Sequence, residues 1–233
     1  EDIVMCPGKE DMFNFLEDIV REVVPLFPGK YFHIGGDECP KTSWKNCPTC
    51  QKRIEAEGLQ ADGKHSAEER LQSYVIKRME KMLAKYDRKI IGWDEILEGG
   101  LSPDATVMSW RGTSGGISAA LQKHDVIMTP GSGGLYLDHY QGDYKIEPVT
   151  IPSAPAYLSR TYNYEPVPDT IKSLGLEKHI LGVQCNNWSE YMYTNAKMEY
   201  QMYPRSLALA EIAWSPAKKK NFTDFARRVD ANS

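Results

Sequence analysis

Apolar and polar residues alternate along the chain with two periods, one helical and one strand-like. In residues 10–27 the apolar side chains recur at three- and four-residue spacing, which predicts an amphipathic helix. Ser66 and Glu69 form a capping-box pattern, so a longer helix is expected from there to about residue 86. Further apolar stripes predict helices at residues 49–56, 115–122, 197–213 and 222–229.

Five short runs rich in β-branched and aromatic residues predict strands. They lie at residues 31–34, 89–93, 105–110, 126–129 and 180–185. Since these runs alternate with the predicted helices, the pattern indicates an α/β fold with a parallel sheet and helical crossovers. Residues 136–168 are aromatic, polar and proline-containing, and they are expected to form a loop with short helical pieces.

Polar and aromatic residues follow every predicted strand. The segments are Asp37-Glu38, Trp93-Asp94-Glu95, Trp110-Arg111, Tyr136-Leu137-Asp138 and Trp188-Ser189-Glu190. Active sites of (β/α)-barrels are built at the carboxyl ends of the strands, so this layout predicts a barrel with a site on that face. Aromatic rings suit the C–H face of a sugar and carboxylates bind its hydroxyls. Trp44 and Trp214 fall outside the pattern and are expected to be structural.

The first of these segments carries two adjacent acids. Gly35 and Gly36 separate the predicted strand from Asp37 and Glu38, and they let the backbone bend. Successive side chains on a strand point to opposite faces, so both acids can serve one ligand only if the strand has already ended. If both face one cavity, repulsion and burial are expected to separate their pKa values, leaving one anion and one proton donor near neutral pH.

Composition narrows the range of functions. With 28 basic and 32 acidic side chains among 233 residues, the net charge is -4, which argues against nucleic acid or an anionic membrane as the main partner. No apolar run approaches the ~20 residues that span a bilayer. Hydrophobic content of 41% and charged content of 26% are typical of a globular protein, and the length suits one sizeable domain or a large part of one.

Five cysteines occur in the chain, so at least one thiol lacks a partner within it. Three of them, Cys39, Cys47 and Cys50, cluster after the acid pair. A zinc site would need a fourth ligand, for which His65 is the nearest downstream candidate. Three cysteines without a clear fourth ligand favour a local disulfide or plain thiols, so no metal and no other cofactor is predicted.

Residues 33–38 read His-Ile-Gly-Gly-Asp-Glu, and this segment resembles the His-x-Gly-Gly-Asp-Glu signature of glycoside hydrolase family 20, the β-N-acetylhexosaminidases. The four later strand-end segments also resemble family motifs, in the family's order, and residues 207–214 resemble its last barrel helix. The resemblance implies a (β/α)8 TIM barrel, of which residues 1–233 are expected to supply about strands 4–8 as one partial catalytic domain. A missing N-terminal half or a homo-oligomer would complete such a barrel, and full activity of the chain alone is not expected.

The resemblance also implies a function. The implied function is that of a retaining exo-β-N-acetylhexosaminidase, which removes terminal, non-reducing N-acetylglucosamine or N-acetylgalactosamine through an oxazolinium intermediate. Asp37 is expected to orient the substrate's 2-acetamido group, Glu38 to serve as general acid and then base, and His33 to support this pair. The substrate-binding residues that the resemblance implies are Trp93, Trp110, Tyr136, Asp138, Trp188 and Glu190.

One wall of the implied pocket departs from the family pattern. The family usually has a further tryptophan in the loop after the Tyr-Leu-Asp segment, and Tyr164 is expected to replace it here. A glycan substrate and a secreted, periplasmic or lysosome-like compartment are implied by the family alone.

Two other hypotheses stay open at this point. The first is a sugar-binding protein that has lost catalysis, although the intact Asp37 and Glu38 argue against it. The second is a glycosidase of another family that opposes two carboxylates, Glu38 with either Glu95 or Glu190.

Overall fold

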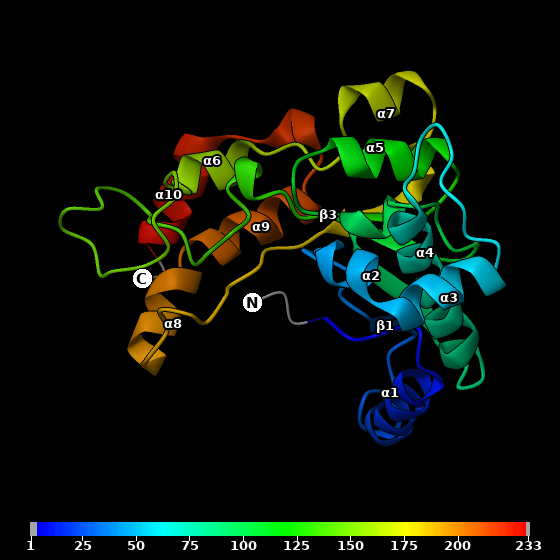
Figure 1. Cartoon of the computed structure of the whole chain (residues 1–233). Coiled ribbons are helices and arrows are strands. Elements are labelled where there is room, and N and C mark those ends of the chain that lie inside the picture. The colour runs from blue at the N-terminus through cyan, green and yellow to red at the C-terminus, as the bar shows by residue number, and fades with distance from the viewer. Residues whose placement is uncertain (1–3, 232–233) are drawn as a thin grey trace. The chain divides into compact units, whose positions relative to one another are not determined.

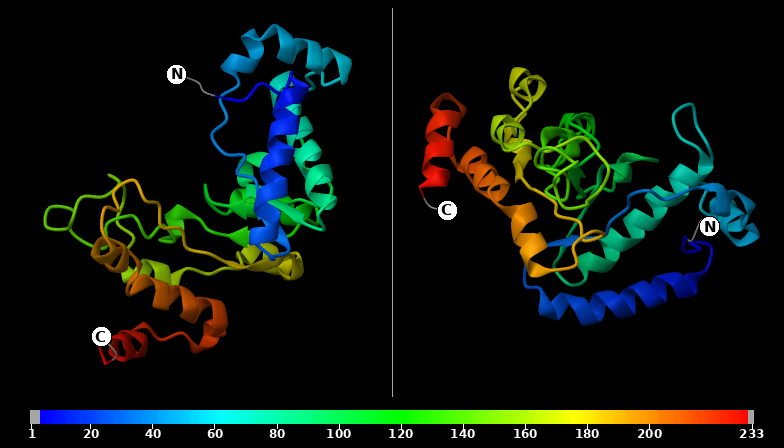
Figure 2. Two further views of the ribbon diagram at one scale, coloured as in Figure 1. Left: turned by 90° about the horizontal axis from the view of Figure 1, so that it is seen from below. Right: turned by 90° about the vertical axis from the view of Figure 1, so that its left-hand side faces the viewer.

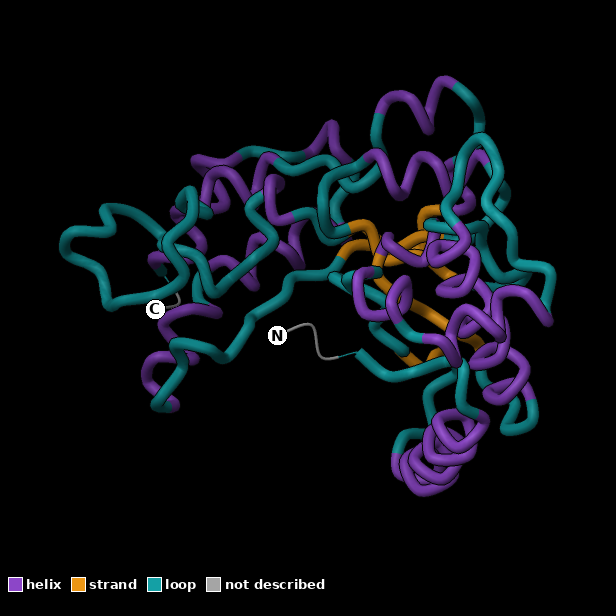
Figure 3. The backbone as a smooth tube through the Cα atoms, viewed as in Figure 1, coloured by secondary structure: helices purple, strands orange, loops and turns teal. Residues whose placement is uncertain are grey.

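The structure is a computed structural model that describes residues 4–231 (Figure 1). Its internal contacts divide the chain into two compact units, Glu1–Met108 and Ser109–Ser233. Helices and short strands alternate through both units (Figure 3), and each strand of the described chain pairs in parallel with a neighbour. The predicted α/β class with parallel strands is therefore confirmed. That residues 1–233 act as a single domain stays a prediction.

The first unit is built on three parallel strands. Its elements are α1 (Glu10–Val23), the 3-10 turn η1 (Val24–Leu26), β1 (Tyr31–His33), α2 (Thr42–Asn46), α3 (Pro48–Ala56), α4 (Ala67–Ala84), β2 (Lys89–Trp93), η2 (Asp94–Leu97) and β3 (Thr106–Ser109), whose last residue begins the second unit. Ile91 of β2 lies opposite both His33 of β1 and Thr106 of β3, so β2 is the central strand of the three.

Helix α4 begins where its capping box predicts. Ser66 Oγ accepts a hydrogen bond from the backbone N–H of Glu69 at 3.1 Å, and Glu69 Oε2 accepts one from the N–H of Ser66 at 2.6 Å. Helix α1 packs against α4 (Figure 2), and the guanidinium carbon of Arg78 lies 4.0 Å from the ring centroid of Phe13. Phe13 and Val20 are the buried residues of α1, which confirms its predicted amphipathic character.

The second unit contains two parallel strands and most of the short helices. Its elements are α5 (Ser114–Leu121), β4 (Val126–Met128), η3 (Gly131–Gly133), α6 (Leu158–Asn163), α7 (Asp169–Ser173), η4 (Glu177–His179), β5 (Ile180–Val183), α8 (Asn195–Met202), α9 (Arg205–Trp214), η5 (Ala217–Lys219) and α10 (Phe222–Asp230). Val126 lies opposite Ile180 in the β4–β5 pair. A buried cluster of Tyr162, Ala208 and Phe225 joins α6, α9 and α10.

The single helix predicted over residues 197–213 is wrong. Two helices occupy this region, and α8 ends at Met202 while α9 begins at Arg205. Pro204 causes the break, because its nitrogen carries no hydrogen to donate and its ring clashes with the preceding turn of a continuous helix. The break places Arg205 in the first turn of α9, where its side chain is fully buried.

The two tryptophans expected to be structural differ in their exposure to solvent. Trp44 is 6% exposed and donates its indole N–H to the carbonyl of Met5 at 2.9 Å, which confirms its structural role. Trp214 is 89% exposed, so the same expectation is wrong for it. It is the last residue of α9, which buries a different face through Ala208 and Ile212. Within residues 4–231 every helix is too short or too polar to span a bilayer.

Candidate active site

The turn after β1 carries the acid pair on an unusual backbone. Gly35, Gly36 and Glu38 have positive φ angles of 73°, 96° and 44°, so three of four consecutive residues adopt conformations that favour glycine. The carbonyl of Gly35 still accepts the backbone N–H of Trp93 at 2.9 Å, which continues the β1–β2 pairing up to the bend. A Cβ on Gly36 would lie 2.7 Å from Ile96 Cγ2. The sequence prediction of a glycine-dependent bend is confirmed.

Both acids of the pair are exposed in the first unit. The enclosed cavity on which the expected separation of their pKa values depends is therefore not formed around them by the described residues of this unit. Each of the two carboxylates lies just beyond the carboxyl end of β1, the position at which barrel enzymes carry catalytic groups.

His33 is held against the same turn. Its Nδ1 accepts a hydrogen bond from the backbone N–H of Gly35 at 3.0 Å, and its ring centroid lies 4.7 Å from that of Trp93. Loss of hydration lowers the pKa of His33, and the nearby Asp37 carboxylate only partly offsets this effect. An unprotonated Nδ1 is the form that accepts this bond. His33 thus braces the first glycine of the turn that carries Asp37.

The segment after β2 is much more enclosed than the acid pair. Trp93 ends the strand with 9% of its surface exposed, and Asp94 and Glu95 are both buried in η2. Gln72 of α4 donates from Nε2 to the backbone carbonyl of Glu95 at 2.9 Å, which fixes this turn. A buried Glu95 and an exposed Glu38 therefore have very different surroundings within the first unit.

Three of the predicted aromatic residues meet in the second unit. The ring of Tyr136 stacks on Trp110 with 6.3 Å between centroids and 12° between planes, and it meets Trp188 edge-on at 6.5 Å. Tyr136 forms a parallel bridge with Asn186, and the N–H of Leu137 donates to the carbonyl of Asn186 at 2.7 Å. This pairing brings segments that are 50 residues apart in sequence to one place, with an aromatic surface suited to the C–H face of a sugar.

Asp138 follows this aromatic cluster and is deeply buried. Only 1% of its surface is exposed, and neither carboxylate oxygen has a hydrogen bond of ordinary geometry within the described chain. Burial, together with the nearby negative charge of Glu190, raises the pKa of Asp138 to about 6. Glu190 itself is exposed. A buried carboxyl group that makes no hydrogen bond of ordinary geometry to residues 4–231 is suited to bind a polar group of a ligand.

The Asp138→Asn variant is expected to flatten the pH dependence of stability between about pH 4 and pH 6. The Asp138 carboxyl has a pKa of about 6 in the folded protein against an ordinary value of 3.8, so the folded state binds this proton more tightly than the unfolded state. Wild-type stability should therefore fall as pH rises through this window, by on the order of 2–3 kcal/mol.

Urea unfolding at several pH values measures this effect, with Asp143→Asn, an exposed aspartate of the same loop, as the control. The control should keep the wild-type slope. An Asp138→Asn variant with the same slope as wild type would refute the assignment.

Tyr164 packs against a glycine turn. A Cβ on Gly133 would lie 2.6 Å from Cδ2 of Tyr164, and one on Gly131 would lie 3.4 Å from the ring of Tyr136. The η3 turn therefore contacts both tyrosine rings at close range. The hydroxyl of Tyr164 is buried without a hydrogen-bond partner among the described residues, and burial raises its pKa.

Arg205 is a positioning residue that the sequence patterns do not identify. Its guanidinium is fully buried and donates to the carbonyls of Leu137 and His139, which flank Asp138 in sequence. It also donates to the carbonyls of Ala156 and Gln201 at 3.2 and 2.7 Å. Burial lowers the pKa of Arg205 to about 10. The signal for Arg205 that the sequence offered was its place at the start of the apolar run at residues 205–214.

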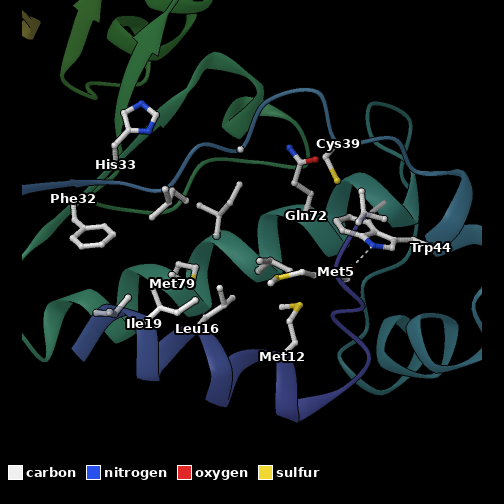
Figure 4. A pocket seen from close by; sticks show the side chains of 16 residues that line it. Met5, Met12, Leu16, Ile19, Phe32, His33, Cys39, Trp44, Gln72 and Met79 are labelled. Atoms are coloured by element: carbon white, nitrogen blue, oxygen red, sulfur yellow. Dashed lines mark hydrogen bonds between the residues drawn. The ribbon is translucent and has the colours of Figure 1, made fainter. Parts of the chain in front are cut away.

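A separate apolar cavity of about 400 Å³ lies in the first unit (Figure 4). Met12 and Leu16 of α1, Phe32 of β1 and Met79 of α4 line it. Neither Asp37 nor Glu38 contributes to its lining. With few polar groups, this cavity is poorly suited to a sugar.

The alternating parallel strands and helices, with acids and aromatic rings after the strand ends, define an α/β protein of the (β/α)-barrel class with features of a carbohydrate site. Residues 1–217 match the family model described as "Glycosyl hydrolase family 20, catalytic domain". The chain belongs to this family, as the strand-end motifs predicted.

Two relatives and one solved structure illustrate the similarity. The chain is 57% identical to a beta-hexosaminidase of Porphyromonas gingivalis over 99% of its own length, and 35% identical to one of Vibrio furnissii over 90%. It superposes on an exo beta-N-acetylglucosaminidase of Vibrio harveyi, solved in complex with N-acetylglucosamine, with a TM-score of 0.89, 30% identity and 99% of this chain covered. The likeness to this family 20 enzyme confirms the predicted barrel fold. The chain spans 29%, 33% and 35% of these three proteins, respectively.

Proposed function

We propose that the protein is a retaining exo-β-N-acetylhexosaminidase that removes terminal, non-reducing N-acetylglucosamine or N-acetylgalactosamine from glycans. The observation that carries this proposal is the turn at residues 35–38, whose positive φ angles present two adjacent acids just beyond β1. Binding alone requires no such pair. The names of the relatives, which are hexosaminidases, support the same activity.

In the proposed reaction the substrate supplies its own nucleophile. The oxygen of the 2-acetamido group attacks the anomeric carbon, and because this group is tethered to the ring, the attack has a high effective concentration. The ionised carboxylate of Asp37 accepts the amide N–H and stabilises the positive charge of the oxazolinium intermediate. His33, hydrogen-bonded to the backbone N–H of Gly35, positions the turn that presents Asp37.

Glu38 moves the protons of both steps. In the first step its carboxylic acid protonates the oxygen of the leaving group as the glycosidic bond breaks. In the second step its carboxylate takes a proton from water as that water opens the oxazolinium ring. Two inversions at the anomeric carbon give retention of configuration.

The aromatic residues bind the sugar and its N-acetyl group in this proposal. Trp93, Trp110 and Trp188 provide flat apolar surfaces for the ring and the acetyl methyl. Tyr136 donates its hydroxyl to the acetamido carbonyl, which holds that oxygen for attack. The stacking of Tyr136 on Trp110 supports this assignment, because it fixes the tyrosine ring.

The remaining residues bind the outer part of the sugar. Asp138 and Glu190 accept hydrogen bonds from hydroxyl groups. The buried Asp138 carboxyl supports this role, because no described residue gives it a hydrogen bond of ordinary geometry. Tyr164 takes the place of the tryptophan that the family usually has in this loop. The compartment and the oligomeric state stay expectations of the family resemblance.

Hydrolysis of aryl N-acetyl-β-D-glucosaminide and N-acetyl-β-D-galactosaminide by the full-length protein tests the proposal. Both substrates should be cleaved with retention, observed by proton NMR of the first-formed anomer, and a thiazoline mimic of the oxazolinium should inhibit competitively. Binding of N-acetylglucosamine without hydrolysis would instead indicate a sugar-binding protein. Activity that is insensitive to the thiazoline would indicate a glycosidase with two opposed carboxylates.

A further inference from the structure

Three thiols converge in the first unit. The Sγ atoms of Cys6, Cys47 and Cys50 all lie within 4.8 Å of one another, with Cys6 at 3.6 Å from Cys47 and 3.4 Å from Cys50. Along the sequence Cys39, Cys47 and Cys50 are the close neighbours. In the structure the third thiol of the group is Cys6 rather than Cys39, because the N-terminal segment brings in Cys6, 41 residues before Cys47.

The distances between these sulfurs suit a shared metal ion. In a tetrahedral zinc site with Zn–S bonds of about 2.3 Å, neighbouring sulfurs are roughly 3.8 Å apart. A disulfide requires a separation of about 2 Å and uses only two of the three thiols. The cluster is also partly enclosed, since Cys50 is fully buried while Cys6 and Cys47 are half-buried.

Two tight backbone turns hold the sulfurs in place. Cys6-Pro7-Gly8 forms one turn, in which the N–H of Lys9 donates to the carbonyl of Cys6 at 3.1 Å. The other turn opens α3 with the sequence Cys47-Pro48-Thr49-Cys50. A Cβ on Gly8 would lie 2.4 Å from the carbonyl carbon of Thr49 and 2.7 Å from the nitrogen of Cys50. Only glycine allows these two turns to touch.

Backbone N–H groups lie against two of the three sulfurs. The N–H groups of Cys50 and Thr49 face the Sγ of Cys47, and the N–H of Gly8 faces the Sγ of Cys50. Peptide N–H groups aimed at a ligand sulfur stabilise its charge and fix its direction, as the outer partners of metal ligands do. These donors hold the sulfurs of Cys47 and Cys50 in fixed directions.

We propose that Cys6, Cys47 and Cys50 bind a zinc ion through three thiolates. Soft thiolate ligands favour Zn²⁺ over hard cations such as Mg²⁺ and Ca²⁺. Among the described residues no histidine, aspartate, glutamate or further cysteine joins this group, so water takes the fourth position. His65, the nearest downstream candidate for a fourth ligand, is not part of this group, and its Nδ1 accepts the backbone N–H of Gly99 at 3.3 Å.

The metal would connect the start of the described chain to the segment that follows the acid pair. Trp44, Ile54 and Leu71 form a buried cluster with Cys50, and Cys6 and Cys47 pack against it. The carbonyl of Met5, next to Cys6, accepts the indole N–H of Trp44. Since α2 and α3 lie in the segment that follows Glu38, the zinc ion would hold this segment in place. Structural zinc contributes directly to folding free energy.

Metal analysis of the purified full-length protein, expressed with zinc and without chelators, tests the proposal. Elemental analysis should find one zinc ion per chain, and X-ray absorption at the zinc edge should find three sulfur ligands at about 2.3 Å. Exchange with Co²⁺ should produce an intense near-ultraviolet band from sulfur-to-cobalt charge transfer. None of these measurements depends on hydrolytic activity.

Cysteine variants locate the site. Cys6→Ser and Cys47→Ser should each lose most of the zinc, whereas Cys39→Ser and Cys185→Ser, which change thiols outside the cluster, should keep it. If a cluster variant does not fold, the wild-type absorption spectrum still decides, since it reports the ligands directly. Wild-type protein without zinc overturns the proposal, as does zinc that the cluster variants retain. A mass lighter by two hydrogens under denaturing conditions, with a disulfide mapped to this cluster, would identify a redox site instead.

Discussion

Replacing Glu38 with glutamine is expected to lower kcat by about 10²- to 10⁴-fold, with little change in KM. Glutamine has the same shape and can adopt the same backbone conformation, but it cannot give a proton to the leaving group or take one from water. Glu38 is exposed in the first unit and has a φ of 44°, so the change removes no buried contact there. The loss should therefore be chemical rather than structural.

Substrates whose leaving groups differ in basicity test this prediction more specifically. A 2,4-dinitrophenyl glycoside needs little protonation, so its first step should be less impaired in Glu38→Gln than that of a phenyl glycoside. Glu55→Gln, an exposed glutamate of α3, is the matched control and should retain wild-type kinetics. Equal losses on both substrates would contradict a role in protonating the leaving group, and unchanged activity would refute the assignment of Glu38.

Replacing Asp37 with asparagine is expected to lower kcat/KM by about 10²- to 10³-fold. Asparagine keeps the size of the side chain but removes the negative charge that the oxazolinium requires. The affinity of the thiazoline inhibitor should fall together with kcat/KM, because both depend on the same charge. Asp11→Asn, an exposed aspartate of α1, is the control and should change neither quantity.

A different outcome would redefine Asp37. If it were a nucleophile, a fluorinated sugar substrate would trap a covalent adduct on this residue, which peptide mass spectrometry would detect. The proposed mechanism predicts no such adduct, since the acetamido oxygen forms the bond to the anomeric carbon. Loss of activity without loss of thiazoline affinity would likewise contradict the proposed role of Asp37.

The strands and the strand-end residues were predictable because their signals are local. Short β-branched runs bounded by glycine and proline define β1 to β5, and a capping box defines the start of α4. The bend that carries the acid pair was predictable for the same reason, since two consecutive glycines indicate a backbone with positive φ angles. These features depend on neighbours within a few residues.

What the sequence did not reveal depends on distant contacts. The convergence of Cys6 with Cys47 depends on how the segment before α1 folds back onto α3. The contact between Tyr136 and Trp188 follows from strand-like pairing with Asn186, a residue that carries no motif. The break at Pro204 was visible, but the apolar stripe on both sides of it outweighed the proline in the prediction.

The buried Arg205 has a practical consequence for engineering. Its guanidinium binds backbone carbonyls on both sides of Asp138 from a helix 66 residues away in sequence, so this loop keeps its shape through a residue outside itself. Grafting residues 136–139 from a relative to alter sugar preference would transfer the loop sequence without the arginine that holds its backbone. The transplantable unit is the loop together with the first turn of α9. Libraries that vary the loop while holding Arg205 constant should yield more folded members than those that vary both.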